Sequence, residues 1–360
     1  MSSIVNRSPE KAQAKPDACL SVSRLCVSIR DPEQRDTKGR PLSSEMVSDV
    51  SFTIAAGQTL GLVGESGCGK SLTAMAIVDL LPKPQVYQSG GEISFNGQRI
   101  DSNDPKALKA LRGKKVAVIF QDPMTALNPV QRTGQQIEEV LKLHFPKMDK
   151  SQRRQRSIQL LNDVGIPSPE NRIDAYPHQF SGGMRQRLMI AMALAGEPDL
   201  LIADEPTTAL DVTIQAQIVA LLKKLQQERN MAMLFITHDL ALVSQVSDHV
   251  VVMYAGKIVE QQDVPHIFSQ PRHPYTKGLI AALPAAVARA PKTKLDAMPG
   301  QVPSIDAMPT GCRFANRCEY ANERCEQEAP ELTAHETGEI SCHHWQTINE
   351  ASTSGVSKNV

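Results

Sequence analysis

Gly64-Glu65-Ser66-Gly67-Cys68-Gly69-Lys70-Ser71 fits the pattern G-x-x-x-x-G-K-[ST]. The stretch follows an apolar run at residues 60–63 and precedes a run with helical spacing from Leu72 to Leu81. Strand, glycine-rich turn and helix are the context in which this pattern is meaningful. Glycines let the backbone curl until its N–H groups converge on phosphate oxygens, and the helix N-terminus adds a favourable dipole. The stretch therefore predicts a phosphate-binding loop, running from Gly64 to Leu72, in an α/β fold.

Two side chains of this loop are expected to act directly on a nucleotide. Lys70 is placed to reach the β- and γ-phosphates, and Ser71 to bind Mg²⁺. Cys68 reads as an inert member of the loop, although an exposed thiol there would be open to alkylation.

A pair of carboxylates follows a second apolar run, at residues 199–203. Asp204 and Glu205 end this expected strand, the arrangement found where a Mg²⁺ ligand meets a group that orients water. The alternative is that they merely cap a helix. The phosphate loop upstream and the strand leading into the pair favour Mg²⁺ and water.

The composition describes a soluble globular chain. The 360 residues are 41% hydrophobic, with zero formal net charge and a mean hydropathy of -0.27, which predicts an ample core and two domains. A purely electrostatic nucleic-acid binder is excluded. No apolar run approaches the ~20 residues needed to cross a bilayer, and the start of the chain is polar, unlike an export signal. We therefore expect a cytoplasmic location.

Periodicity and turn signals predict the elements around these motifs. A polar leader at residues 1–19 is followed by an edge strand at 20–29 and a charged loop at 30–40. Asn96-Gly97 predicts a two-residue hairpin turn in an antiparallel layer. Further strands are expected at 47–54, 59–63, 115–120, 199–203 and 232–236, and helices at 133–143, 151–164, 181–195 and 212–229. Gly165 is placed to cap the second of these helices.

Six motifs taken together resemble, in order and spacing, the nucleotide-binding subunit of an ABC transporter. They are GESGCGKS at 64–71, Gln121, FSGGM at 180–184, LLIADE at 200–205, ALD at 209–211 and His238. The resemblance covers residues 20–262 and implies a RecA-like core, an antiparallel β subdomain and an α-helical subdomain at about 125–195. Alone, Gln121 would be an unremarkable strand-end amide and His238 a satisfied buried histidine.

The resemblance also implies a role for each matching residue. Gln121 is the Q-loop glutamine beside Mg²⁺, and Ser181, Gly182, Gly183 and Met184 form the signature that contacts nucleotide. Asp204 is the Walker B aspartate, Glu205 the catalytic carboxylate, Asp211 the D-loop residue and His238 the catalytic switch histidine. Two positions depart from the family: Met184 stands where Gln is usual, and no aromatic stands at Ile29 or its neighbours Cys26 and Arg30 to stack on adenine.

The tail beyond residue 262 contains a group of four cysteines. They are Cys312, Cys318, Cys325 and Cys342, and a reducing compartment favours a metal or cluster site over disulfides. Neither short gap between them fits a zinc knuckle, and plant-type iron-sulfur spacing differs too, so spacing alone leaves the site open. The stretch 282–303 reads as a linker.

This tail, with His273-Pro274-Tyr275, resembles the C-terminal extension of ATPases of dipeptide and oligopeptide permeases, a group that includes nickel importers. The resemblance implies that residues 263–349 form a small extension, with 350–360 a flexible tail. It also implies a [4Fe–4S] cluster on the four cysteines, with zinc or free thiols as alternatives.

The expected function follows from this family. The chain would hydrolyse ATP between itself and a related but distinct second ATPase, with a homodimer as the alternative, on the cytoplasmic face of the membrane. It would thereby power import of dipeptides or oligopeptides through two permease subunits, with an external substrate-binding protein. The alternatives are import of nickel or another solute, a soluble ABC ATPase of DNA repair or translation, and a purely structural ATP sensor.

Overall fold

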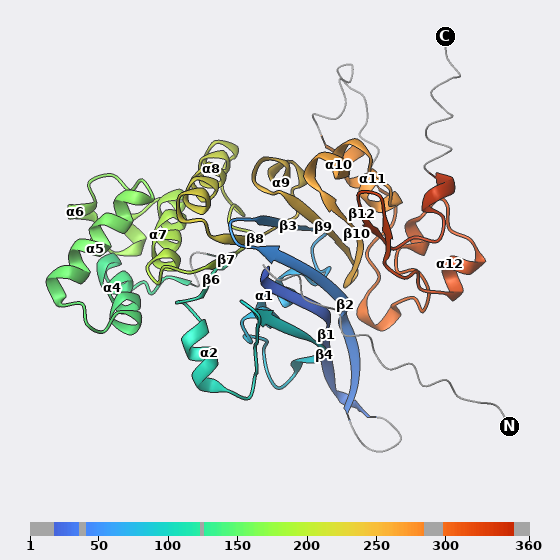
Figure 1. Ribbon diagram of the computed structural model, residues 1–360, viewed down its shortest axis with the longest axis horizontal. Helices are drawn as coiled ribbons and strands as arrows, with labels where there is room; N and C mark the ends of the chain where they lie inside the picture. Colours follow the sequence, from blue (N-terminus) through green and yellow to red (C-terminus); the bar gives the residue numbers. More distant parts are fainter. Residues whose placement is uncertain (1–17, 36–40, 123–125, 284–297, 349–360) are drawn as a thin grey trace, which may run out of the picture.

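The structure is a computed structural model that describes residues 18–35, 41–122, 126–283 and 298–348 (Figure 1). The ends of the chain, residues 36–40, Pro123 to Thr125 and most of the linker expected at 282–303 lie outside the described residues. The charged loop expected at 30–40 is wrong for its first part, because β1 continues to Arg35. A mixed sheet of eight strands crosses the centre of the molecule, in the order β11-β12-β10-β9-β3-β8-β7-β6. Its bounds are β3 Thr59–Val63, β6 Val116–Ile119, β7 Leu200–Asp204, β8 Ala232–Thr237, β9 His249–Tyr254 and β10 Lys257–Asp263, with β11 and β12 given below.

The middle of this sheet is parallel and enclosed on both faces. β3 pairs in parallel with both β8 and β9, and β7 pairs in parallel with β6 and β8. All residues of β3, β7 and β8 are buried, which accounts for their nearly unbroken apolar sequences. The loops that leave β3, β6, β7 and β8 at their carboxyl ends therefore share one edge of the sheet, where α/β proteins bind ligands.

A second, antiparallel sheet of four strands has the order β2-β1-β4-β5. Its bounds are β1 Ala18–Arg35, β2 Pro41–Ala55, β4 Val86–Phe95 and β5 Gln98–Arg99. The prediction that residues 20–29 form an edge strand was wrong, because β1 pairs with β2 on one side and β4 on the other. The predicted hairpin joins β4 to β5, where Asn96 and Gly97 both have positive φ, as a type I′ turn requires.

Figure 1 shows helices α4 to α7 gathered at one end of the molecule. Ser181 and Asp211 cap α7 and α8 by accepting backbone N–H groups, and Gly165 ends α5 with a φ of 73°. The helices are α1 Lys70–Ile77, α2 Pro105–Leu111, α4 Thr133–His144, α5 Lys150–Asp163, α6 Pro169–Arg172, α7 Gly182–Leu194, α8 Val212–Arg229, α9 Leu240–Val246, α10 Val264–Ser269, α11 Pro274–Ala281 and α12 Glu323–Gln327.

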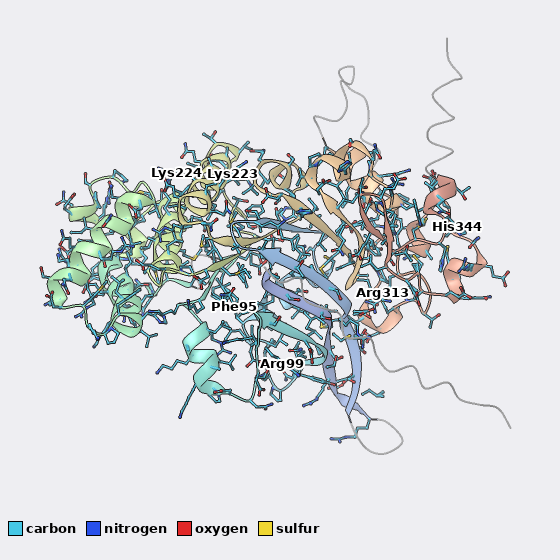
Figure 2. The ribbon with its side chains drawn as sticks, in the orientation of Figure 1. Phe95, Arg99, Lys223, Lys224, Arg313 and His344 are labelled. Atoms are coloured by element: carbon cyan, nitrogen blue, oxygen red, sulfur yellow. The ribbon has the colours of Figure 1, made fainter. Side chains whose placement is uncertain are left out.

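The C-terminal segment packs directly on the central sheet. Its hairpin, β11 Thr333–His335 and β12 Gly338–Ile340, adds to β10 as the last two strands. Arg313 donates a hydrogen bond to the carbonyl of Ala255 in the turn between β9 and β10, and Figure 2 shows Arg313 where this segment meets the central strands. The boundary expected between residues 262 and 263 falls inside β10, so the extension and the sheet share one hydrogen-bonded ladder.

Candidate functional site

The phosphate loop connects β3 to α1, as the sequence predicts. Gly67 and Gly69 have φ values of 80° and 97°, a left-handed conformation that a side chain disfavours. The helix begins at Lys70, two residues before the predicted Leu72, and ends at Ile77. Lys70 and Ser71 therefore belong to its first turn, where backbone N–H groups are free to meet an anion.

Lys70 is held inside the loop that precedes it. Its Nζ donates to the carbonyl oxygens of Gly64 at 2.8 Å and Glu65 at 3.0 Å. The same ammonium lies 4.0 Å from a carboxylate oxygen of Glu205, and the Lys70 side chain is only 4% exposed. The structure thus brings the loop lysine to the end of β7.

Ser71 and Asp204 meet across the same space. The Ser71 Oγ donates to Asp204 Oδ1 at 3.1 Å. Burial raises the pKa of the Asp204 carboxyl, while the hydrogen bond from Ser71 opposes that rise. A hydroxyl beside a carboxylate at the mouth of a phosphate loop is the ligand set that Mg²⁺ uses in nucleotide-binding proteins.

Glu205 is the centre of the remaining contacts. It leaves β7 with a φ of 46°, and its N–H donates to the carbonyl of Ile236 on β8. Its Oε2 accepts from Gln121 Nε2 and from Thr208 Oγ1, each at 3.0 Å, and lies 3.4 Å from His238 Nδ1. The loops after β6, β7 and β8 each supply one partner. Thr208 was not predicted, although its place one turn beyond Glu205 could have indicated it.

The signature residues lie elsewhere. Ser181 accepts a hydrogen bond from the Met184 N–H and so caps α7, within the helical group of Figure 1. Asp211 caps α8 through the N–H of Ile214, whose side chain packs closely against Gly183. Ser181, Gly182, Gly183 and Met184 thus gather with the D-loop residue, while the other site residues gather at the edge of the sheet.

Cys68 is fully buried, which corrects the idea of an exposed, alkylatable thiol. Burial raises its pKa, with Lys70 acting in the opposite direction. The sulfur packs under the loop beside Gly64, so Cys68 supports the loop from within.

Comparison with known proteins decides the family. Residues 47–208 match the model of the ABC transporter family, and residues 259–325 match the oligopeptide/dipeptide transporter C-terminal region. The chain is 48% identical to the dipeptide transport ATP-binding protein of Escherichia coli, over 91% of this chain and 97% of that protein. The chain belongs to the ABC transporter family. Its membership of the dipeptide and oligopeptide group of ATP-binding subunits is confirmed.

Other relatives agree with this assignment. The oligopeptide transport ATP-binding protein of Bacillus subtilis is 50% identical over 81% of this chain and 82% of its own length. The solved cbiO1 of Clostridium perfringens, part of an ABC transporter complex, aligns with a TM-score of 0.58 and 27% identity over 71% of this chain and 92% of that one. A bacterial ABC transporter cassette, 24% identical with a TM-score of 0.59 over 68% and 98% of the two chains, shares the fold. This chain is accordingly an ABC ATPase, for which ATP and Mg²⁺ are the expected ligands.

The absence of an adenine-stacking aromatic on β1 has a structural counterpart. Ile29 pairs across the sheet with Val86, and its neighbour Ser28 pairs with Tyr87. The Arg30 guanidinium lies over the Tyr87 ring, 4.3 Å from its centroid. Tyr87, an aromatic beside this position in the sheet, therefore stands on β4, and the guanidinium of Arg30 lies over its ring.

All four tail cysteines line one small cavity. His273 and Phe314 line the same cavity. Among the residues that the structure describes, no three histidine, cysteine, aspartate or glutamate side chains are grouped to hold a single metal ion. The structure thus gives no support to a preformed zinc site. The iron-sulfur expectation likewise has no support from a preformed ligand group in the described residues.

No helix in the described segments is long and apolar enough to span a membrane.

Proposed function

We propose that this ABC ATPase powers the import of dipeptides or short oligopeptides, working at the cytoplasmic face of the membrane. The observation that carries the proposal is the 48% identity to a dipeptide transport ATP-binding protein along 97% of that protein's length. The similarity includes the C-terminal region, which the motifs of nucleotide binding do not require. A soluble ABC ATPase of DNA repair or translation would have no reason to keep that region.

The chemistry we assign to the site is water attack on the γ-phosphorus of ATP, with cleavage of its bond to the bridging oxygen. Lys70 would neutralise charge on the β- and γ-phosphates, and Ser71, Asp204 and Gln121 would hold Mg²⁺. Glu205 would accept the proton of the attacking water. The hydrogen bond from Thr208 holds the Glu205 carboxylate in place, and His238 lies beside it.

A second ATPase subunit completes the proposed site. The signature residues begin α7, and Figure 1 shows α7 with the helical group, apart from α1, which begins at Lys70. In this proposal the signature of each subunit covers the nucleotide bound by the other, and Asp211 lies at their contact. We propose a related but distinct partner, because permeases of this group commonly use two different ATPases.

The remaining proposed partners are two membrane-spanning permease subunits and an external substrate-binding protein. The segment 121–129 would transmit closure of the ATPase pair to the permease subunits. Gln121 supports this idea, because it contacts Glu205 from the start of that segment. The transported solute would never touch this chain.

The test of the proposed function is reconstitution of the complex in proteoliposomes with its substrate-binding protein. The tagged chain is expected to recover a second ATPase and two membrane proteins. Dipeptide is expected to stimulate ATP hydrolysis and to accumulate inside the vesicles, whereas Ni²⁺ alone is not. Recovery of ribosomes or DNA with the tagged chain, or transport of Ni²⁺ in place of peptide, would overturn the proposal.

We further propose a [4Fe–4S] cluster on Cys312, Cys318, Cys325 and Cys342. All four line one cavity, and none of them forms a disulfide. Burial raises the pKa of Cys312, Cys318 and Cys342, the last to about 11, and the neighbouring thiols raise these values further. Cysteines ligate metals and clusters as thiolates, so binding of a positively charged group would replace the thiol protons. The cluster would staple a segment with few apolar residues.

Anaerobic purification is expected to give about four irons and four sulfides per chain, as the cluster type requires. Replacing Cys325 with serine is expected to remove both together. Replacing Cys26, which stands on β1 outside the cavity, is the matched control and should leave the iron and sulfide content unchanged. Stoichiometric zinc without sulfide would reject the cluster and indicate a zinc site on these cysteines.

A further inference from the structure

The C-terminal extension hydrogen-bonds to the phosphate loop at Glu65. Arg317 Nη1 lies 3.0 Å from both carboxylate oxygens of Glu65, and the hydroxyl of Tyr275 accepts the Glu65 backbone N–H at 3.0 Å. These partners are 252 and 210 positions away along the chain. Figure 1 shows the orange and red segments that carry them at the same end of the molecule as β9 and β10.

Both partners are themselves firmly held. Arg317 also donates through Nε to the carbonyl of Pro299 at 2.8 Å, and its side chain is only 4% exposed. The Tyr275 ring packs edge-on against Tyr254 at the end of β9, with centroids 4.8 Å apart. Phe314 completes this buried aromatic cluster, in contact with both tyrosines. The two groups that hold Glu65 therefore rest on the central sheet.

Every polar group of Glu65 has a partner within the protein. The Glu65 N–H donates to the hydroxyl of Tyr275, and the Glu65 carboxylate accepts from Arg317. The Glu65 carbonyl accepts from Lys70 Nζ at 3.0 Å. The extension thereby holds Glu65 in position, and the carbonyl of Glu65 in turn holds the ammonium of Lys70. The expectation that Glu65 contacts phosphate needs refinement, because its N–H and side chain are both directed to the extension.

We infer that Arg317 and Tyr275 are positioning residues for ATP, acting through Glu65 on the ammonium of Lys70. The C-terminal extension then contributes to ATP binding by positioning the phosphate loop. A prepositioned loop binds its ligand more tightly because less ordering remains to be done on binding. The inference rests on ATP binding by this ABC ATPase and not on the proposed peptide substrate, so either can fail alone.

The experiment uses the complete transporter and compares the KM for ATP with kcat. Arg317→Met keeps an unbranched apolar stem and removes the charged guanidinium. It is expected to raise KM about 5- to 100-fold, the usual range for coupling between sites, with kcat within about threefold of the parent. Tyr275→Phe retains the ring packing and loses one hydrogen-bond acceptor, so a rise of about fivefold is expected.

A double-mutant cycle distinguishes positioning from general weakening of the fold. If Arg317 acts through Glu65, combining Arg317→Met with Glu65→Gln should raise KM no more than the worse single change does. Arg324→Met is the control, because Arg324 forms an exposed ion pair with Glu328 in the same extension. Its KM should stay unchanged.

Three outcomes would overturn the inference. They are an unchanged KM in Arg317→Met, a loss confined to kcat, or KM effects of the two substitutions that simply multiply. Should Arg317→Met fail to fold, Tyr275→Phe decides, and a KM within twofold of the parent would reject the role.

Discussion

Replacing Glu205 with glutamine is expected to lower ATP turnover by the assembled transporter ~10² to 10⁴-fold, the range for a lost general base. The amide has the size of the carboxylate and still offers one oxygen to the donors Gln121 and Thr208. It cannot take a proton from water. Because Lys70, Ser71 and Asp204 are untouched, binding of Mg²⁺·ATP is expected to remain. Steady-state phosphate release and equilibrium nucleotide binding measure the two effects separately.

The matched control is Glu92→Gln, the same chemical change on β4. Glu92 pairs with Arg99 at 3.0 Å, and the two side chains are 65% and 68% exposed, so little is expected to change. Figure 2 shows Arg99 in the antiparallel layer, away from the central sheet. A rate in Glu205→Gln equal to that of the control would reject the catalytic role. It would also revive the reading of this chain as a structural ATP sensor.

The fold could be predicted best where one sequence pattern runs unbroken through a whole element. β3 and α8 have the bounds that the sequence indicates, because an enclosed strand and a long capped helix each show a clear pattern. β1 was wrongly predicted to be an edge strand. Alternation of apolar and polar residues indicates that one face of a strand is buried, but it does not indicate how many strands pair with it. β2 and β4 lie on either side of it, and only the tertiary structure reveals them.

The site was predictable to the extent that its members belong to contiguous motifs. Lys70, Ser71, Asp204, Glu205 and His238 were all named from sequence, and the structure gathers them at one edge of the sheet. Arg317 and Tyr275 were missed because nothing in an isolated arginine or tyrosine tells which loop it contacts. Their link to Glu65 arises only when the extension folds back over more than half of the chain.

Gly64 occupies the tightest position in the phosphate loop, which leads to the second large expected effect. A Cβ at this position would lie 2.2 Å from the carbonyl oxygen of Met253 and 2.7 Å from the sulfur of Cys68. Met253 belongs to β9, which pairs with β3 in the middle of the sheet, so its backbone cannot retreat. The loop must then move instead. Because the Gly64 carbonyl accepts from Lys70, the lysine would move with it.

Gly64→Ala is therefore expected to lower the free energy of unfolding by about 3 kcal/mol, the upper part of the overpacking range. It should also abolish measurable ATP binding, because Lys70 loses its position. Gly97→Ala is the matched control: it too has a positive φ, of 74°, but a Cβ there meets nothing within 4 Å. Backbone strain alone should cost about 1 kcal/mol there and leave ATP binding unchanged. Urea unfolding and nucleotide titration of both variants separate backbone strain from the steric clash with Met253. If both variants lost the same free energy of unfolding and the same ATP binding, the approach of Met253 would not be the reason for glycine at residue 64.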